Sequence, residues 1–159
     1  MNDEIENVAV RLLTERRKTL ALAESCTGGF IAHQITNVPG ASKIFLGGIV
    51  AYGNGVKEKF LGVRPEILKR HGAVSKVVAR EMAEGARERF GADFAIAVTG
   101  IAGPAGGTKA KPVGTVFIAL AGNFETVVKR KSNCFGREKF KKVTADQALE
   151  LLLSQFRRM

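Results

Sequence analysis

Apolar and polar positions along the chain follow two periods, one typical of helices and one of strands. Residues 4–17 place apolar side chains three or four positions apart among charged ones, which predicts an amphipathic helix. The longest helical pattern covers residues 76–90, with Ser75 in the N-cap position and Gly91 just beyond its end. Further helices are expected over residues 27–36, 56–61, 65–70 and 137–156.

Short apolar runs between these segments predict strands. They cover residues 19–23, 44–52, 93–98, 113–120 and 125–131. The last two flank Ala121-Gly122-Asn123 and resemble a hairpin. Because helices and strands alternate early and a hairpin comes late, we expect a three-layer α/β/α sandwich with a mixed, mostly parallel sheet. With no repeat or linker, residues 1–159 are expected to form a single domain.

Composition narrows the class of protein. No apolar stretch is long enough to cross a bilayer, and the N-terminal residues are acidic, unlike a signal peptide. A cytoplasmic protein with no membrane partner is therefore expected. Two cysteines and two histidines provide neither a disulfide framework nor a ligand set for a metal, so we expect no metal and no cofactor.

The formal charge of +10 invites a nucleic-acid interpretation, because basic surfaces gain affinity for nucleic acid by counterion release. Much of the excess lies in residues 129–142, while the chain has one Tyr and no Trp for base stacking. A solvated basic face is therefore the favoured interpretation, and the charge could equally attract a small phosphorylated substrate. Nucleic acid is not expected as a partner.

The first place for chemistry follows the first predicted strand. There, Ala23-Glu24-Ser25-Cys26-Thr27-Gly28-Gly29 leads into a predicted helix, whose N-terminal N–H groups could hold an anion or oxyanion. Judged from the motif alone, Ser25 or Thr27 as a helix cap is the favoured interpretation. The segment is not a G-x-S-x-G elbow, and no suitable His–Asp pair accompanies it.

A second candidate loop follows the strand that ends at Val98. Residues 99–108 read Thr-Gly-Ile-Ala-Gly-Pro-Ala-Gly-Gly-Thr, and successive glycine N–H groups can form an anion-binding nest. Loops of this length and composition are more often functional than not. The segment matches neither a phosphate-binding P-loop nor a dinucleotide fingerprint.

A nucleophilic serine needs a base. His33 lies within a helical pattern and His71 at a helix end, so structural roles are favoured for both. A lysine whose pKa is lowered by burial can substitute, and Lys57, just beyond the second strand, is the candidate. The residues by themselves indicate a small α/β protein with two glycine-rich ligand loops.

Several of these segments, in order, resemble the CinA C-terminal-domain family, whose characterised members are nicotinamide mononucleotide amidohydrolases. Residues 23–29 match the family's A-E-S-C-T-G-G, and residues 47–63 its G-G-I-V-A-Y-x-N-x-x-K-x-x-L-L-G-V segment. Residues 71–83 and 97–116 match two further blocks. The resemblance spans nearly the whole chain.

The resemblance implies an α/β/α fold and hydrolysis of nicotinamide mononucleotide to nicotinate mononucleotide and ammonia. It implies that Ser25 attacks the amide carbonyl, that Lys57 takes the Ser25 proton, and that Tyr52 lies near the pair. Thr99 would orient the base or the substrate, and backbone N–H groups after Ser25 and in the loop would hold the oxyanion and phosphate. Implied substrate-binding positions are Thr27, Gly28, Gly29, Ser42, Gly100, Gly103, Gly106, Gly107 and Arg137.

The chain departs from the family pattern at two places. Many members have Asp at the position of Ala105, and the usual G-D-R-x-x-V-R lacks its Asp in residues 136–141, although Arg137 and Lys141 keep its basic character. That region is one where a phosphate contact or a subunit contact is implied, and a homo-oligomer is expected. The alternative is a relative that binds nucleotide without hydrolysing it. The separate pyrophosphatase activity of longer relatives is not expected.

Overall fold

The computed structural model describes residues 3–159. Local sequence and backbone agree at the helix ends: the Ser75 hydroxyl accepts a 3.3 Å hydrogen bond from the Val78 N–H, and Gly91 ends the same helix in the left-handed conformation. The elements are α1 Ile5–Arg16, β1 Leu20–Glu24, α2 Phe30–Thr36, the 3₁₀ helix Ala41–Lys43, β2 Phe45–Val50, α3 Asn54–Leu61, α4 Pro65–His71, α5 Lys76–Phe90, β3 Phe94–Gly100, β4 Thr115–Gly122, β5 Phe124–Ser132 and α6 Arg137–Arg158.

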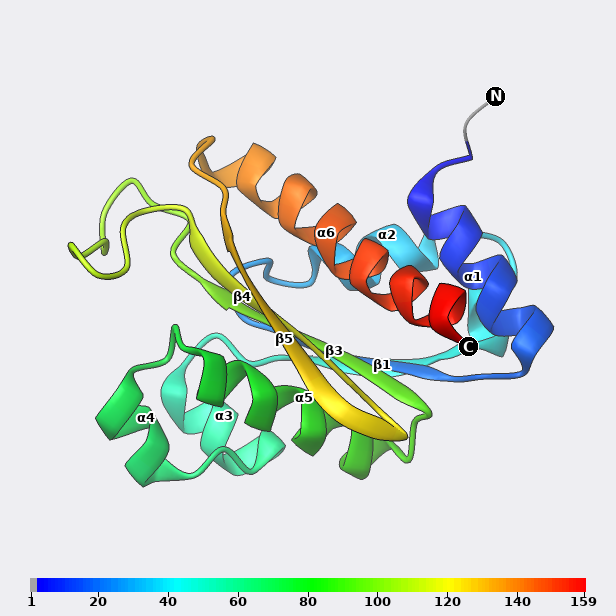
Figure 1. Ribbon diagram of the computed structural model, residues 1–159, viewed down its shortest axis with the longest axis horizontal. Helices are drawn as coiled ribbons and strands as arrows, with labels where there is room; N and C mark the ends of the chain where they lie inside the picture. Colours follow the sequence, from blue (N-terminus) through cyan, green and yellow to red (C-terminus); the bar gives the residue numbers. More distant parts are fainter. Residues whose placement is uncertain (1–2) are drawn as a thin grey trace.

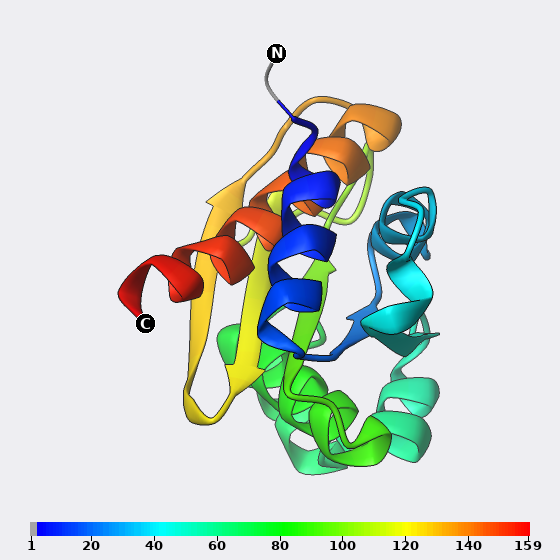
Figure 2. The ribbon, with the colours of Figure 1, turned by 90° about the vertical axis from the view of Figure 1, so that its right-hand side faces the viewer.

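The strands form one sheet in the order β2-β1-β3-β4-β5. β1 is parallel to β2 and β3, whereas β4 is antiparallel to both of its neighbours. Helices α1, α2 and α6 cover one face of the sheet, and α3, α4 and α5 cover the other (Figures 1 and 2). The three-layer α/β/α sandwich with a mixed sheet is therefore confirmed.

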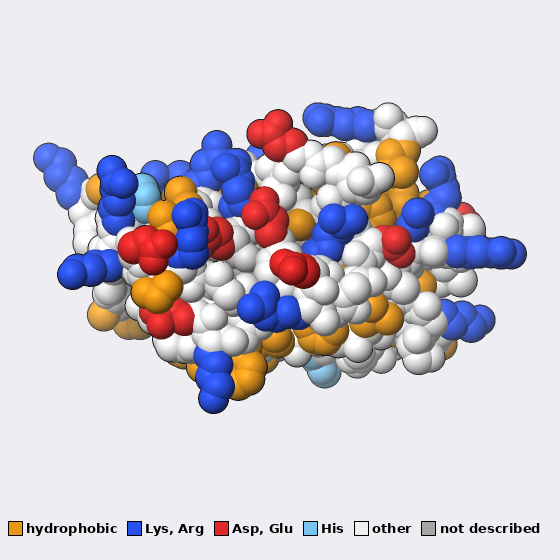
Figure 3. Space-filling view, turned by 90° about the horizontal axis from the view of Figure 1, so that it is seen from below, with side chains coloured by type: hydrophobic (Ala, Val, Ile, Leu, Met, Phe, Trp, Pro, Cys, Tyr) orange, Lys and Arg blue, Asp and Glu red, His pale blue; other side chains and the backbone are white. Residues whose placement is uncertain are grey.

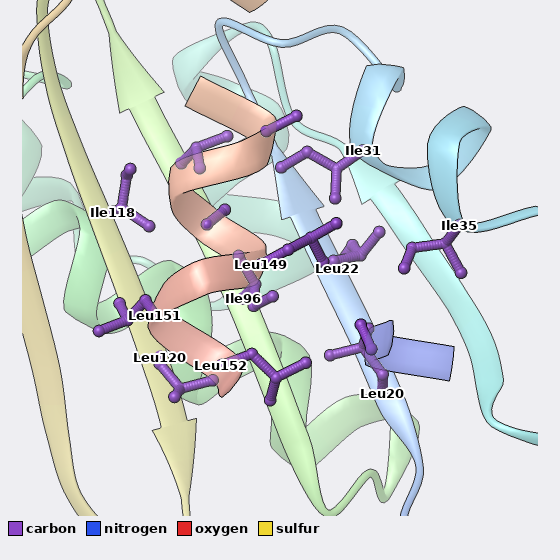
Figure 4. Packing of buried hydrophobic residues seen from close by; sticks show 14 of the residues in the cluster. Leu20, Leu22, Ile31, Ile35, Ile96, Ile118, Leu120, Leu149, Leu151 and Leu152 are labelled. Carbon is purple, nitrogen blue, oxygen red and sulfur yellow. The ribbon is translucent and has the colours of Figure 1, made fainter. Parts of the chain in front are cut away.

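The two faces of the sheet carry side chains of different size, because successive residues of a strand point to opposite faces. Leu20 and Leu22 of β1 point toward α1, α2 and α6, as Figure 4 shows, and burial of each contributes about 1.5–3 kcal/mol. The opposite face presents mainly alanine in β1, β3 and β4, which lets α5 pack close to the sheet. Gly85 of α5 lets α3 pack equally close to α5. A Cβ at Gly85 would overlap the Leu61 carbonyl oxygen at the end of α3.

Helix α2 begins later than the sequence predicts. The expected helix over residues 27–36 starts at Phe30, so Ser25 to Gly29 form a turn between β1 and the helix. Gly28 and Gly29 have φ values of 59° and 100°, which glycine adopts without strain. This turn, rather than a helix N-terminus, carries the candidate nucleophile.

The surface over α3, α4 and α5 carries both signs of charge. Figure 3 shows acidic side chains among basic ones on this face, with long basic side chains projecting around its rim. Such mixing gives no single-sign track on the face that Figure 3 displays. Within residues 3–159, no helix is long and apolar enough to cross a membrane.

Candidate active site

A pocket of about 230 Å³ opens at the carboxyl ends of the three parallel strands. This edge is the usual ligand position in open α/β sheets, because the loops that follow neighbouring parallel strands meet there. Ser25 follows β1, Tyr52 and Lys57 follow β2, and Thr99 and Gly100 end β3. The lining consists of Ser25, Cys26, Tyr52, Lys57, Ala73, Val74, Thr99, Gly100, Ala102 and Arg137.

Ser25 and Lys57 are in direct contact inside this pocket. Lys57 Nζ lies 3.1 Å from Ser25 Oγ and donates to the Tyr52 carbonyl oxygen at 3.1 Å. Lys57 lies in the first turn of α3, and only 1% of the residue is exposed. The Tyr52 carbonyl fixes the amine on one side and leaves it directed at the serine hydroxyl.

The surroundings of Lys57 favour its neutral form. Burial lowers the pKa of the ammonium below its ordinary value of 10.5, and a charged Cys26 would raise it. Burial also raises the pKa of the Cys26 thiol to about 12, so Cys26 is uncharged near neutral pH and its opposing effect is absent. Among the described residues, Lys57 forms no ion pair. A neutral lysine amine can accept the proton of a serine hydroxyl.

Glu24 precedes the candidate nucleophile and is also buried, with 2% of the residue exposed. Its carboxylate accepts hydrogen bonds from the Thr27 hydroxyl at 2.7 Å, the Ile31 N–H at 2.8 Å and the Ala32 N–H at 3.0 Å. Glu24 thus caps α2, whose N-cap residue has no side chain. The prediction that N–H groups at this helix start hold a substrate anion is wrong for Ile31 and Ala32, because Glu24 occupies them.

Two other backbone N–H groups near Ser25, those of Cys26 and Thr27, lie against the Cys26 thiol. The Ser25 N–H donates to the Val98 carbonyl oxygen at 3.1 Å, and the Gly28 N–H donates to the Ser25 carbonyl oxygen at 3.0 Å. Within residues 3–159, the N–H groups of Cys26 and Thr27 donate to no backbone oxygen. They follow the nucleophile directly, where an oxyanion hole needs its donors.

Thr99 and Tyr52 hold the walls of the pocket together. The Thr99 hydroxyl donates to the Ala73 carbonyl oxygen at 2.8 Å, which ties the end of β3 to the segment before α5. Its proton is therefore committed, and only its oxygen is left to accept a bond from substrate or lysine. The Tyr52 side chain is exposed, so its contribution to the Ser25–Lys57 pair is made through its carbonyl oxygen.

Arg137, the first residue of α6, also lines the pocket. Its guanidinium donates to the Gly103 carbonyl oxygen at 2.6 Å and to the Tyr52 hydroxyl at 3.3 Å. It therefore joins the loop after β3 to the loop after β2. The structure brings Arg137 to the pocket, and its role in binding substrate stays a prediction.

The glycine-rich loop contributes less than the sequence predicts. Gly100 lines the pocket, but Gly103 offers a carbonyl oxygen to Arg137, and Gly106 and Gly107 lie outside the lining. A Cβ on Gly107 would lie 2.6 Å from the Val113 nitrogen, so this glycine serves the folding of the loop onto itself. Figure 1 shows the loop projecting beyond the end of the sheet. The anion nest expected over residues 100–107 does not form around the pocket.

Ser42 is not brought to this site. It lies exposed in the 3₁₀ helix before β2. Phe45, which starts β2, pairs with Leu20 at the beginning of β1, whereas the pocket lies where Val50 pairs with Glu24. Ser42 is therefore at the opposite edge of the sheet. Thr27, Gly28 and Gly29 lie in the turn after Ser25, and the buried Thr27 hydroxyl points to Glu24.

A larger groove of about 640 Å³ lies between α3 and α5, but its chemistry is poorer. Its Arg64 side chain is paired with Glu81 at 2.5 Å, and Arg89 donates to the Leu61 carbonyl oxygen at 3.1 Å. No serine, cysteine or lysine is among its lining residues. The smaller pocket, with a serine against a buried lysine, is the candidate active site.

The sequence does not indicate separate roles for two residues of this site. Glu24 and Cys26 flank the nucleophile in the chain, and the motif alone assigns them no function. The available signal is a carboxylate and a thiol on either side of a serine, at the end of a predicted buried strand. Ala73 and Val74 carried no chemical signal, because they contribute shape and a backbone carbonyl oxygen.

The sequence of this chain is similar to that of known proteins. The family model of the CinA C-terminal domain matches residues 2–156. A CinA-like protein of Thermotoga maritima is 57% identical over 121 residues, which cover 76% of this chain and 30% of that protein. A CinA-like protein of Parasynechococcus marenigrum is 47% identical over 153 residues, which cover 95% of this chain and 36% of that protein. The chain thus spans about a third of the length of these curated relatives.

Solved structures cover the chain more completely. The crystal structure of the competence/damage inducible protein CihA from Agrobacterium tumefaciens is 40% identical, with a TM-score of 0.91, covering 97% of this chain and 96% of that one. A competence-damaged protein (CinA) superfamily protein from Escherichia coli is 35% identical, with a TM-score of 0.89, covering 96% and 92%. Fold, motifs and sequence agree, and the chain belongs to the CinA C-terminal domain family.

Proposed function

We propose that the chain is an amidohydrolase that converts nicotinamide mononucleotide to nicotinate mononucleotide and ammonia, with Ser25 as nucleophile and Lys57 as general base. The observation that carries the proposal is the 3.1 Å contact between Ser25 Oγ and the Nζ of a buried lysine without an acidic partner. Family membership supports the choice of substrate. The proposal applies to the chemistry of this domain.

In the first half of the reaction, the Ser25 oxygen bonds to the carboxamide carbon while its proton passes to Lys57. The carbonyl oxygen becomes an oxyanion, and in this proposal the N–H groups of Cys26 and Thr27, which directly follow the nucleophile, stabilise it. When the C–N bond breaks, Lys57 returns that proton to the departing nitrogen, and ammonia leaves. An ester between Ser25 and the nicotinoyl group remains.

In the second half, water attacks the ester carbon and Lys57 accepts a proton from it. The carbon–oxygen bond to Ser25 breaks, and the proton returns to Ser25 Oγ. The carboxyl group carries the second proton of the water and releases it to solvent, which leaves the nicotinate carboxylate. A single base serves both halves, so no second titratable side chain is required in the pocket.

The test is a discontinuous assay of ammonia and nicotinate mononucleotide with the wild type, Ser25→Ala and Lys57→Ala. We expect turnover by the wild type and a loss of about four to six orders of magnitude in kcat in Ser25→Ala. Calorimetry with nicotinamide mononucleotide accompanies the assay. Saturable binding without product from the wild type would replace the proposal with that of a non-hydrolysing nucleotide-binding protein.

A further inference from the structure

A second pocket, the amino-edge pocket, lies at the edge of the sheet opposite to Ser25 and has a volume of about 370 Å³. Lys18 precedes β1 and Asp93 precedes β3, so this pocket lies where these strands begin, whereas the candidate active site lies where they end. The turn between β4 and β5 and the end of α6 complete it, and Figure 2 faces this end of the molecule. The two pockets have no lining residue in common.

The apolar part of the amino-edge pocket is aromatic. Phe94, which starts β3, is buried, and its ring centre lies 6.2 Å from that of Phe124 and 5.6 Å from that of Phe156. Phe156 is buried as well, whereas 37% of Phe124 is exposed. An exposed ring that packs against buried rings offers a planar ligand a surface on which to stack.

Three cations line the amino-edge pocket without a carboxylate partner. Lys18, Arg87 and Arg158 come from the segment before β1, from α5 and from α6, and they form no ion pair within residues 3–159. Lys18 and Arg87 are half-buried. The Arg87 Nε donates to the Asp93 carbonyl oxygen at 3.0 Å, which orients the guanidinium and leaves its terminal nitrogens free for an anion.

The carboxylates near these cations do not pair with them. Asp93 has the one acidic side chain in the lining, and this side chain accepts hydrogen bonds from the Thr19 N–H at 2.8 Å and hydroxyl at 3.0 Å. Glu84 and Glu88 line a neighbouring hollow that Arg87 also lines, and neither forms an ion pair with it. The lining side chains thus carry an excess of two positive charges, which matches a phosphomonoester of about −1.5 to −2 at pH 7.

The polar side chains of the other grooves are more fully engaged. In the groove between β5 and α6, Glu150 accepts from Arg157 at 2.7 Å. In the groove between α3 and α5, Arg64 is paired with Glu81. The amino-edge pocket differs from both, because its cations are unpaired and surround an exposed aromatic ring.

We infer that the amino-edge pocket binds a small aromatic phosphate, with the ring on Phe124 and the phosphomonoester at the three cations. The volume of about 370 Å³ lies within the roughly 300–1,000 Å³ that is typical of small-molecule sites. Partial burial of Lys18 and Arg87 without a counterion has a cost that such a ligand removes. Since the pocket lies at the other edge of the sheet, the inference goes beyond the proposed amidase and does not depend on it.

The probe is adenosine 5′-monophosphate, which carries both an aromatic ring and a phosphomonoester. Calorimetry compares it with adenosine, which lacks the phosphate, and with ribose 5-phosphate, which lacks the ring. We expect saturable binding of the monophosphate by the wild type and weaker binding of both fragments. Ribose 5-phosphate that bound as tightly as the monophosphate would overturn the inference.

Variants of the lining test each part of the contact. Lys18→Met keeps the apolar stem without the charge and should raise the Kd of the monophosphate about tenfold. The exposed Arg158 contributes less, so Arg158→Ala should raise the Kd about twofold to fivefold. Phe124→Leu removes the ring and keeps an apolar side chain, and should raise the Kd about twofold to tenfold.

Two further variants show where the monophosphate binds. Arg157→Ala removes the same charge next to Arg158, from a side chain that is paired with Glu150, and should leave the Kd unchanged. Arg137→Ala alters the pocket of Ser25 and should also leave it unchanged. An absence of saturable binding to the wild type, an equal effect of Arg157→Ala, or weakening by Arg137→Ala alone overturns the inference. Calorimetry needs no turnover, so the result holds whether or not the chain releases ammonia.

Discussion

Glu24 and Lys57 lie on either side of Ser25 and do not pair with each other. The Glu24 carboxylate is directed to the Ile31 and Ala32 N–H groups of α2, on one face of the sheet. Lys57 approaches from α3, on the other face, and contacts Ser25 and the Tyr52 carbonyl oxygen. The hydrogen-bonding capacity of the carboxylate is directed to α2, and Lys57 forms no ion pair within residues 3–159. A buried lysine that is not paired with the neighbouring carboxylate can act as a base.

Replacing Glu24 tests the cap on α2. Glu24→Ala removes a buried acceptor and leaves two helix N–H groups and the Thr27 hydroxyl without their partner. We expect a loss of about 2 kcal/mol in the free energy of unfolding, measured in urea. Since the same turn carries Ser25, kcat should fall with little change in KM. Glu24→Gln keeps one acceptor oxygen and should lose less of both; a stability equal to the wild type in Glu24→Ala would contradict the capping role.

The state of Lys57 sets the pH dependence of the proposed reaction. Burial lowers its pKa below 10.5, and only the neutral amine accepts the Ser25 proton. We expect kcat/KM to rise with pH and to level off at an apparent pKa below 10.5. Lys57→Arg should be inactive at every pH, because the guanidinium stays protonated. A rate profile that is flat from pH 6 to 10 in the wild type would argue against a lysine base.

The same burial predicts that Lys57 lowers the stability of the fold. The pKa of Lys57 in the folded chain is below its unfolded value near 10.5. Between these two pKa values the unfolded chain binds more protons than the folded chain, so the fold loses stability as the pH falls from 10.5. Lys57→Met keeps the volume without the charge and should raise the free energy of unfolding by about 0.5–2 kcal/mol at pH 7. The gain should shrink as the pH approaches 10.5. Urea unfolding at pH 7 and 10 measures it, with Lys59→Met, an exposed position on α3, as control.

The sequence predicted the framework of this molecule better than the contacts within the site. Helices and strands follow from local periodicity, and the meeting of Ser25, Lys57 and Thr99 follows from the rule that parallel strands share a carboxyl edge. The cap by Glu24 was not predictable, because it depends on α2 beginning at Phe30. Ser42 was misplaced because a match to a motif carries no information about which edge of the sheet a residue occupies.

Cys26 should be chemically silent although it lines the pocket. Burial raises the pKa of its thiol to about 12, with a smaller contribution from the negative charge of Glu24. Almost no thiolate exists at pH 7.5, and the residue is 5% exposed. A disulfide reagent should therefore titrate one thiol, that of the exposed Cys134, in the folded protein and two in guanidinium. Rapid titration of two thiols without denaturant would show that the pocket opens. Cys134→Ser should then give none in the folded state.

The contact between α3 and α5 offers a test of how Lys57 is held in place. Gly85→Ala would press a methyl group against the Leu61 carbonyl oxygen, and α3 would have to move away from α5. We expect a loss of about 1–3 kcal/mol in the free energy of unfolding. Because Lys57 is on α3, the displacement should also lower kcat.

Gly55→Ala is the matched control, since a Cβ there meets nothing within 4 Å. It replaces glycine by alanine, the better helix former, near the start of α3, the helix that carries Lys57. It should therefore raise the free energy of unfolding by about 0.5–1 kcal/mol. Urea unfolding and ammonia release on both variants complete the test. If Gly85→Ala lost stability but kept the wild-type kcat, the position of Lys57 would not depend on the close packing of α3 against α5.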